Sequence, residues 1–235
     1  MTKMFLALFC LTMTGMVMAA ESSLYNFSWL DKDKEIYVLQ NRKFRKDGKV
    51  YIGGNVGKTL SGAFIDAYGG SLRGGFFFSE DWGIELLYGK SMGKENTTAK
   101  GIREQGTVPF YRKVDSYTGA MLMWSPFYSK INTFNRIFYY DWLFGAGAAS
   151  VGTKDNRARF VNQSDSTLKT DSSIGLLWTT GMRFYIDQHW SVRLDFTGMN
   201  WKADRFGKPQ SSGVVRKKSD YFNNYDVAVG LNYAF

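Results

Sequence analysis

The sequence predicts an all-β fold, an antiparallel transmembrane β-barrel of eight strands with short turns at one end and long loops at the other. The first observation is that large apolar residues alternate with small or polar ones in eight segments after residue 48, the period of two expected of strands. The second is that the links between these segments are alternately short and long. This layout is typical of a membrane-spanning barrel with both of its ends on the short-turn side.

Each predicted strand is one alternating run of residues. The eight runs are Val50–Lys58, Ala67–Phe78, Trp82–Ser91, Val114–Ser125, Arg136–Ala149, Ser172–Ile186, Trp190–Trp201 and Tyr225–Phe235. The last run alternates most clearly, and its large residues are Tyr225, Val227, Val229, Leu231, Tyr233 and Phe235.

The links divide into two classes. Brief links follow the first, second, fourth and sixth strands: Thr59–Asp66, Ser79–Asp81, Pro126–Asn135 and Asp187–His189. Long polar links follow the third, fifth and seventh strands: Met92–Lys113, Ser150–Asp171 and Lys202–Asp220. The long links are therefore expected to be outer loops, and the turns after strands two, four and six to be periplasmic.

The first 48 residues precede the predicted barrel. Residues 1–19 have the basic start, short apolar core and small-residue cleavage site of a secretory signal peptide. The single cysteine, Cys10, would leave with this leader, so the mature chain has no disulfide framework. Residues 20–48 are too apolar for a free tail and are expected to fold against the periplasmic mouth or a neighbouring subunit. Residues 49–235 form the predicted barrel.

Composition limits how the chain can occupy a membrane. Hydrophobic residues make up 44% and aromatic residues 17% of the sequence, which excludes a disordered chain. After the leader, no apolar run is long enough to cross a membrane as a helix. A membrane location therefore requires a closed barrel, which pairs every backbone polar group.

The small and polar parity of the strands is expected to face the lumen. An eight-stranded barrel has an interior just wide enough for side chains, so several large residues per strand would overfill it. A soluble, lipocalin-like barrel and a β-sandwich with one wet face are the competing folds. The inward parity carries three basic and three acidic residues that can neutralise one another: Arg73, Glu85, Asp141, Arg183, Arg193 and Asp195. Their distances from the short turns predict one cluster of Arg183, Arg193, Glu85 and Asp195.

Aromatic residues gather where the predicted strands meet the short turns. Trp82 and Trp190 follow such turns, Trp124 precedes one, and Phe235 ends the chain. These positions suit an interfacial girdle, in which each ring has one side in lipid and the other in water.

The final segment, Tyr225–Phe235, resembles the C-terminal assembly signal of bacterial outer-membrane proteins. The mature chain resembles small outer-membrane β-barrels of the OmpA/OmpX type, and more closely the outer-membrane β-barrel domain proteins of predatory deltaproteobacteria. The closer likeness rests on Gln40-Asn41-Arg42-Lys43-Phe44 and on Trp124-Ser125-Pro126. The resemblance implies an integral protein of a Gram-negative outer membrane, assembled by the barrel-insertion machinery, with no agreed activity. Some porin-like relatives look like ring-forming oligomers. The resemblance therefore also suggests a homo-oligomer that organises or encloses lipid.

Charge is concentrated in the three long loops. The net charge of +9 would suggest nucleic acid in a soluble protein, but the basic excess lies in predicted outer loops, which points to outer-membrane lipid or other anionic surface molecules. The expected cationic rim comprises Lys94, Lys100, Arg103, Arg112, Lys113, Lys202, Arg205, Lys208, Arg216, Lys217 and Lys218. Loop solubility without any partner is the alternative.

The sequence favours a structural or porin-like surface component over an enzyme. The only histidine, His189, lies in a periplasmic turn, so serine and acidic residues of the outer loops have no activating base. Gly53–Thr59 lacks the spacing of a phosphate loop, and Asp155, Asp165 and Asp171 lack that of a calcium site. No metal or cofactor is expected. A lipid-modifying or hydrolytic enzyme and a passive pore are the alternatives.

Small residues on the lipid-facing parity suggest a route to self-association. Gly70 and Gly74, Ala146 and Ala148, and Gly198 leave low patches between large residues, and small residues let backbones approach within a membrane. Side-by-side homo-oligomers are therefore expected.

Overall fold

The computed structural model describes residues 42–133, 136–161, 167–209 and 215–235, with the side chains of 160–161, 206–209 and 215–217 excepted. The predicted leader, its cleavage site and residues 20–41 lie outside this range. The strands are β1 (Val50–Thr59), β2 (Ile65–Phe77), β3 (Trp82–Glu95), β4 (Arg112–Thr133), β5 (Arg136–Asp155), β6 (Lys169–Tyr185), β7 (Trp190–Pro209) and β8 (Val215–Ala234). Two short helices are α2 (Thr97–Glu104) and α3 (Ala158–Val161).

The eight strands form one closed antiparallel barrel, which confirms the predicted fold. Each strand pairs with its sequence neighbours, and β8 closes the ring against β1 from Tyr51↔Ala234 to Thr59↔Asp226. The backbone of Phe235 completes the seam, because its N–H donates to the Val50 carbonyl at 2.9 Å. Closure leaves no unpaired sheet edge in the wall.

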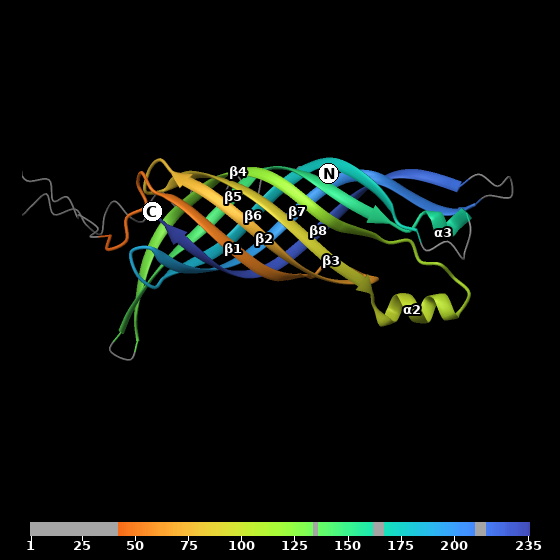
Figure 1. The fold of residues 1–235 in the computed structure, drawn as a ribbon, viewed down its shortest axis with the longest axis horizontal. Coiled ribbons are helices and arrows are strands. Elements are labelled where there is room, and N and C mark those ends of the chain that lie inside the picture. Colours follow the sequence, from red (N-terminus) through yellow and green to blue (C-terminus); the bar gives the residue numbers. More distant parts are fainter. Residues whose placement is uncertain (1–41, 134–135, 162–166, 210–214) are drawn as a thin grey trace, which may run out of the picture. The chain divides into compact units, whose positions relative to one another are not determined.

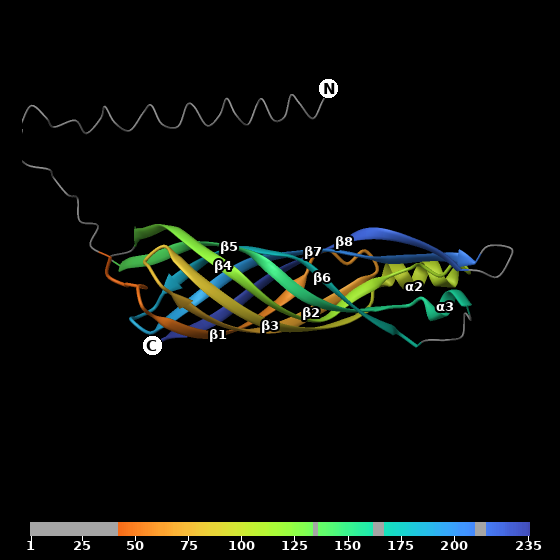
Figure 2. The ribbon, with the colours of Figure 1, turned by 90° about the horizontal axis from the view of Figure 1, so that it is seen from above.

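The two ends of the barrel differ as predicted. The C-terminus and the short turns lie at one end, whereas α2 and α3 lie at the other (Figures 1 and 2). Asn96 caps the N-terminus of helix α2, because its side chain accepts a hydrogen bond from the Ala99 amide at 2.9 Å. Neither this helix nor any other among the described residues is long and apolar enough to cross a membrane.

Several strands are longer than predicted. The link Pro126–Asn135 was expected to be irregular, but β4 and β5 stay paired as far as Thr133↔Arg136. The link Lys202–Asp220 was expected to be a loop, but β7 and β8 stay paired as far as Pro209↔Val215. A hairpin that extends beyond the barrel can meet water on both faces, so its strands lack the apolar alternation on which the prediction relied.

The lumen is more apolar than predicted. Its inward parity includes buried large residues beside the charged and small ones: Tyr51, Phe77, Leu87, Met121, Met123, Leu143, Leu177 and Met199. Glycines on neighbouring strands make room for them, because a Cβ at Gly145 would lie 2.6 Å from the Met121 sulfur and 2.7 Å from the Met123 sulfur. Strands such as β4 carry apolar residues on both parities, and there the period of two does not separate the faces.

Candidate functional site

Four charged side chains form a buried network in the middle of the lumen. Arg193 of β7 contacts Glu85 of β3 at 2.5 Å and Asp195 at 2.7 Å. Arg73 of β2 contacts the same two carboxylates at 2.9 Å and 3.6 Å. All four side chains are almost completely buried. Two arginines alternate with two carboxylates, so the set is neutral and crosses the lumen from β2 and β3 to β7.

Two polar residues of β1 complete this network. The Tyr51 hydroxyl donates to Glu85 at 2.5 Å, and the Asn55 amide donates to Asp195 at 2.8 Å. Both belong to the inward parity, so the alternation of β1 could have identified them. Neither is charged, and the search for a charge-balanced lumen overlooked them. These extra donors help to offset the desolvation of the two carboxylates.

Arg183 lies apart from the cluster in which it was predicted, and this expectation is wrong. Its guanidinium lies over the ring of Tyr51 at 4.7 Å and the ring of Phe77 at 5.3 Å. Its Nε and Nη2 meet no hydrogen-bond acceptor among the described residues. Parity placed the side chain inside the barrel correctly, but it could not show that aromatic rings would occupy the space between Arg183 and the carboxylates. The contact is a cation–π interaction rather than an ion pair.

Asp141 forms a second ion pair closer to the short turns. The Lys46 ammonium donates to Asp141 at 2.8 Å and to the Ser125 hydroxyl at 2.7 Å. The Tyr185 hydroxyl also donates to Asp141, at 2.5 Å. Lys46 precedes β1 and lies outside the alternating pattern, so no periodicity indicates that its side chain enters the barrel. Burial lowers the pKa of Lys46, and the Asp141 carboxylate opposes that shift.

Residues 42–49, which we call the N-terminal strap, cover the short-turn mouth. Phe44 stacks on Tyr185 with ring centroids 4.9 Å apart and meets Tyr139 edge-on at 5.3 Å. Arg42 binds Asp81 at 3.0 Å and Glu80 at 3.4 Å in the β2–β3 turn. Residues 42–48 of the strap are the described part of predicted segment 20–48, and the strap fills this mouth with an aromatic ring and a lysine.

Glu80 fixes the strap to the β2–β3 turn. Its carboxylate accepts hydrogen bonds from the Lys46 amide at 3.1 Å and from Arg45 at 3.4 Å. Partial burial raises the pKa of Glu80, but hydrogen bonds from Lys46, Arg45 and Asp47 outweigh that effect and hold the pKa below 4.5. The strap therefore depends on an ionised carboxylate at neutral pH.

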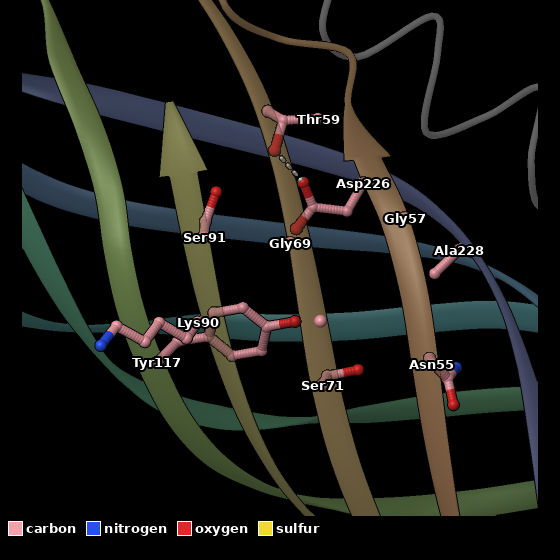
Figure 3. Close-up of a pocket in the computed structure, with 11 residues that line it drawn as sticks. Asn55, Gly57, Thr59, Gly69, Ser71, Lys90, Ser91, Tyr117, Asp226 and Ala228 are labelled. Atoms are coloured by element: carbon pink, nitrogen blue, oxygen red, sulfur yellow. Dashed lines mark hydrogen bonds between the residues drawn. The ribbon is translucent and has the colours of Figure 1, made fainter. Parts of the chain in front are cut away.

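The rest of the lumen is divided into small cavities. The one in Figure 3 has a volume of about 30 Å³ and is lined by Asn55, Ser71, Tyr117, Asp226 and their neighbours. The Thr59 hydroxyl donates to Asp226 at 2.6 Å across it (Figure 3). Further cavities of about 40 Å³ and about 20 Å³ lie near the outer end and beside the strap. Each volume is on the scale of a water molecule.

Acidic partners neutralise much of the predicted cationic rim. Arg112 binds Asp155 at 2.9 Å and Asp171 at 3.1 Å, Arg103 binds Glu95 at 2.7 Å, and Arg205 lies 3.6 Å from Asp220. The Lys113 ammonium donates to the Gly93 carbonyl at 2.9 Å. The described cations of the predicted set that are exposed and form no ion pair with a described carboxylate are Lys94, Lys100, Lys202 and Lys218, whereas Arg103 and Arg205 are exposed but paired. The side chains of Lys208, Arg216 and Lys217 lie outside the described part.

The predicted girdle residues lie together at the short-turn end. Trp82 pairs in register with Trp124, and their rings stack with centroids 6.0 Å apart. Trp190 meets Tyr233 edge-on at 5.0 Å, and Tyr233 meets Phe235 at the same separation. In the terminal segment, Val227, Val229, Leu231 and Phe235 are exposed on the outer wall, whereas Tyr225 and Tyr233 are half-buried.

The small-residue patches are only partly open. A Cβ at Gly70 would meet a single atom within 4 Å, the Asn55 carbonyl oxygen at 3.5 Å, and Ala146 and Ala148 are exposed. Gly198 is different, because the Trp178 ring lies over it and a Cβ there would approach that ring within 2.2 Å. The expected low patch on β7 is therefore wrong, since Trp178 fills it.

The histidine lies apart from the described acidic residues of the candidate calcium site. The described residues include no cluster of three His, Cys, Asp or Glu side chains able to hold a metal ion. His189 stacks on Tyr233 in the β6–β7 turn, with ring centroids 5.6 Å apart. Asp155 and Asp171 contact Arg112 and Arg157, while Asp165 lies outside the described residues.

A closed eight-stranded ring with an apolar outer wall and a filled lumen defines a small membrane-spanning β-barrel. Residues 39–235 match the model of the outer membrane protein beta-barrel domain family, and the chain belongs to that family. It is an integral protein of a Gram-negative outer membrane. No curated protein sequence matches the chain.

The chain is similar to several solved structures of outer-membrane barrels. The outer membrane protein OprG from Pseudomonas aeruginosa matches with a TM-score of 0.50 and 17% identity, over 82% of this chain and 98% of that one. The N-terminal β-barrel domain of OprF from the same bacterium matches with a TM-score of 0.47 and 13% identity, over 80% of this chain and 98% of that one. Neisserial surface protein A matches with a TM-score of 0.48 and 10% identity, over 80% of this chain and 100% of that one. At 17% identity, the similarity to OprG shows a shared fold and nothing about function.

Proposed function

We propose that this protein is a sealed structural barrel of the outer membrane, and that a single barrel neither conducts ions nor catalyses a reaction. The observation that carries the proposal is the network of Arg73, Glu85, Arg193 and Asp195 across the mid-lumen. A water-filled pore would solvate these charges, whereas here Arg193 and Glu85 are each 0% exposed. Their burial is favourable only while the ion pairs persist.

Two further layers of side chains support the proposal that the lumen is sealed. Below the network, Arg183 covers Tyr51 and Phe77, and Lys46 binds Asp141. Above it, Leu177 and Met199 pair in the β6–β7 register and belong to one buried apolar cluster. An ion that crossed the lumen would have to displace all three layers, because the interior of an eight-stranded barrel is close to side-chain volume.

The outer end would then be the functional surface. Its exposed lysines keep a positive field beyond the membrane, which attracts anionic surface polymers or lipid headgroups. Paired arginines such as Arg112 and Arg103 would stabilise the loops rather than bind a partner. On this proposal, only the lysines of the cationic rim attract a partner.

Planar-bilayer recordings test the proposal directly. Purified monomeric protein should give no stable ion-sized conductance, while heat-modifiable migration shows that the barrel is folded. A general outer-membrane porin recorded in the same bilayers is the positive control. The quadruple variant Arg73→Ser, Glu85→Ser, Arg193→Ser, Asp195→Ser removes only the charged layer and leaves no unpaired charge, so it should also stay closed while the other two layers remain. Stable conductance of the folded parent would overturn the proposal.

A further inference from the structure

The outer wall carries a groove that the sealed lumen does not use. Its volume is about 1270 Å³, and its lining residues come from β7, β8, β1, β2, β3 and β4. Across these strands the paired residues Leu194–Val229, Val229–Val56, Val56–Gly70 and Gly70–Lys90 form one outward row. Gly70 provides the floor, because it has no side chain and a Cβ there would meet only one backbone oxygen.

One half of this groove is apolar and the other is basic. Leu194, Val229 and Val56 are exposed on the β7, β8 and β1 side. Lys58, Lys90 and Lys94 are exposed on the β1 and β3 side, and among the described residues none of the three lies within ion-pair distance of a carboxylate. The Lys58 ammonium lies 5.5 Å from the centre of the Tyr68 ring, which also lines the groove.

The carboxylates of the groove do not neutralise Lys58 and Lys90. Asp115 binds Lys154 at 2.9 Å, and Glu95 binds Arg103 and Arg159, each at 2.7 Å. Asp66 lies opposite Lys94 in the β2–β3 register. Two lysines beside the glycine floor are therefore available to an anion.

The basic half lies at the outer boundary of the membrane. Lys58 follows Val50 by eight residues, and Lys90 follows the girdle residue Trp82 by eight residues. Eight residues of a strand tilted by about 40° rise by roughly 20 Å, and the apolar band of such barrels is about 25 Å tall. Lys58 and Lys90 are thus placed where the phosphates of outer-leaflet lipids lie, with the apolar row at and below that depth.

We infer that this groove binds a phosphorylated acyl lipid of the outer leaflet. Its phosphate lies between Lys58 and Lys90, where charge-assisted hydrogen bonds are strong, and an acyl chain lies over Gly70 against Val56, Val229 and Leu194. The site is on the outside of the wall and goes beyond the sealed lumen. A symmetric contact with a second copy is disfavoured, because it would bring the same lysines of both copies together.

Native mass spectrometry of the full-length protein with bis-phosphorylated lipid A as the probe tests this site. The Lys58→Gln, Lys90→Gln double variant should weaken binding roughly tenfold or more, equivalent to at least about 1.4 kcal/mol. Gly70→Leu should weaken it as well, because the new side chain fills the floor while Lys58 and Lys90 remain. The control is Lys100→Gln with Lys202→Gln, which removes the same charge from exposed positions outside the groove and should leave binding unchanged.

Each other outcome overturns the inference. Equal weakening by the control pair would mean diffuse attraction to a basic surface, and full binding by Gly70→Leu would mean that the groove is not used. A dimer of the lipid-free protein that Gly70→Leu abolishes would make the groove a contact between copies. Heat-modifiable migration of every variant excludes misfolding as the cause of lost binding, and none of these readouts depends on conductance.

Discussion

Lys46 lies before the first strand, yet its ammonium is 2.8 Å from the carboxylate of Asp141, which is buried in the fifth. Lys46 is 3% and Asp141 0% exposed in their side chains, so the ion pair is shielded from water and salt. It joins the N-terminal strap to the wall from inside the lumen. The strap therefore belongs to the folded barrel rather than to a separate tail.

Removing one partner of this pair should destabilise the barrel strongly. Lys46→Ala leaves Asp141 buried without its cation, which typically costs about 3 to 5 kcal/mol. The midpoint of heat-modifiable migration should fall clearly. Arg45→Ala is the matched control, because its ion pair with Glu80 is largely exposed and worth about 1 kcal/mol or less. Adding Asp141→Asn to Lys46→Ala should restore part of the loss, and no recovery would contradict the assignment.

The two buried arginines of β6 and β7 should differ. Arg193→Ala leaves Glu85 and Asp195 short of a cation and should cost about 3 to 5 kcal/mol. Arg183→Ala removes contacts with two rings and should cost about 1 to 2 kcal/mol, the scale of a desolvated cation–π interaction. Thermal midpoints of the two variants, measured in the same detergent, check the order. If the thermal midpoint of the Arg183 variant were lower than that of the Arg193 variant, contacts with the two rings would not be the main role of Arg183.

The strap should loosen in acid through Glu80. Because the folded pKa of Glu80 is below its ordinary 4.5, its stabilising contribution is complete above pH 4.5 and is lost as the pH falls through the folded value. Limited proteolysis at about pH 3 with an acid-active protease should cleave the strap faster than at pH 7 while the barrel stays intact. Glu80→Gln should show the fast cleavage at both pH values. A pH-independent rate in the parent protein would contradict this role.

The last residue should matter for assembly more than for the stability of the finished barrel. Phe235 is 68% exposed, and its side chain contacts the ring of Tyr233 while its backbone closes the β1 seam. Phe235→Lys keeps the backbone bond but places a charge at the girdle, so the fraction inserted in the outer membrane should fall severalfold. Phe235→Tyr retains an aromatic end and should insert normally. Equal insertion of the Lys variant would argue against a terminal assembly signal.

In strands that alternate large apolar with small or polar residues, the parity that faces the lumen follows from the sequence alone. The alternation assigns Arg73 of β2, Glu85 of β3, and Arg193 and Asp195 of β7 to the lumen. The structure confirms that all four side chains are buried there. Successive side chains of a strand point to opposite faces, so this assignment needs no knowledge of the neighbouring strands. The order of the strands and the closed ring follow from the short turns and from the apolar outer wall.

Depth within the lumen was only partly predictable from the sequence. Distances from the short turns brought Arg193, Glu85 and Asp195 together correctly, but they also placed Arg183 in that cluster and left Arg73 out of it. Which charges meet depends on the stagger between strands, and closure of β8 on β1 fixes that stagger around the whole ring. Arg183 thus meets aromatic rings, Asp141 meets Lys46 from outside the strands, and Trp178 covers Gly198 from the adjacent strand. Each contact joins residues far apart in the chain, and a local period of two carries no information about such distances.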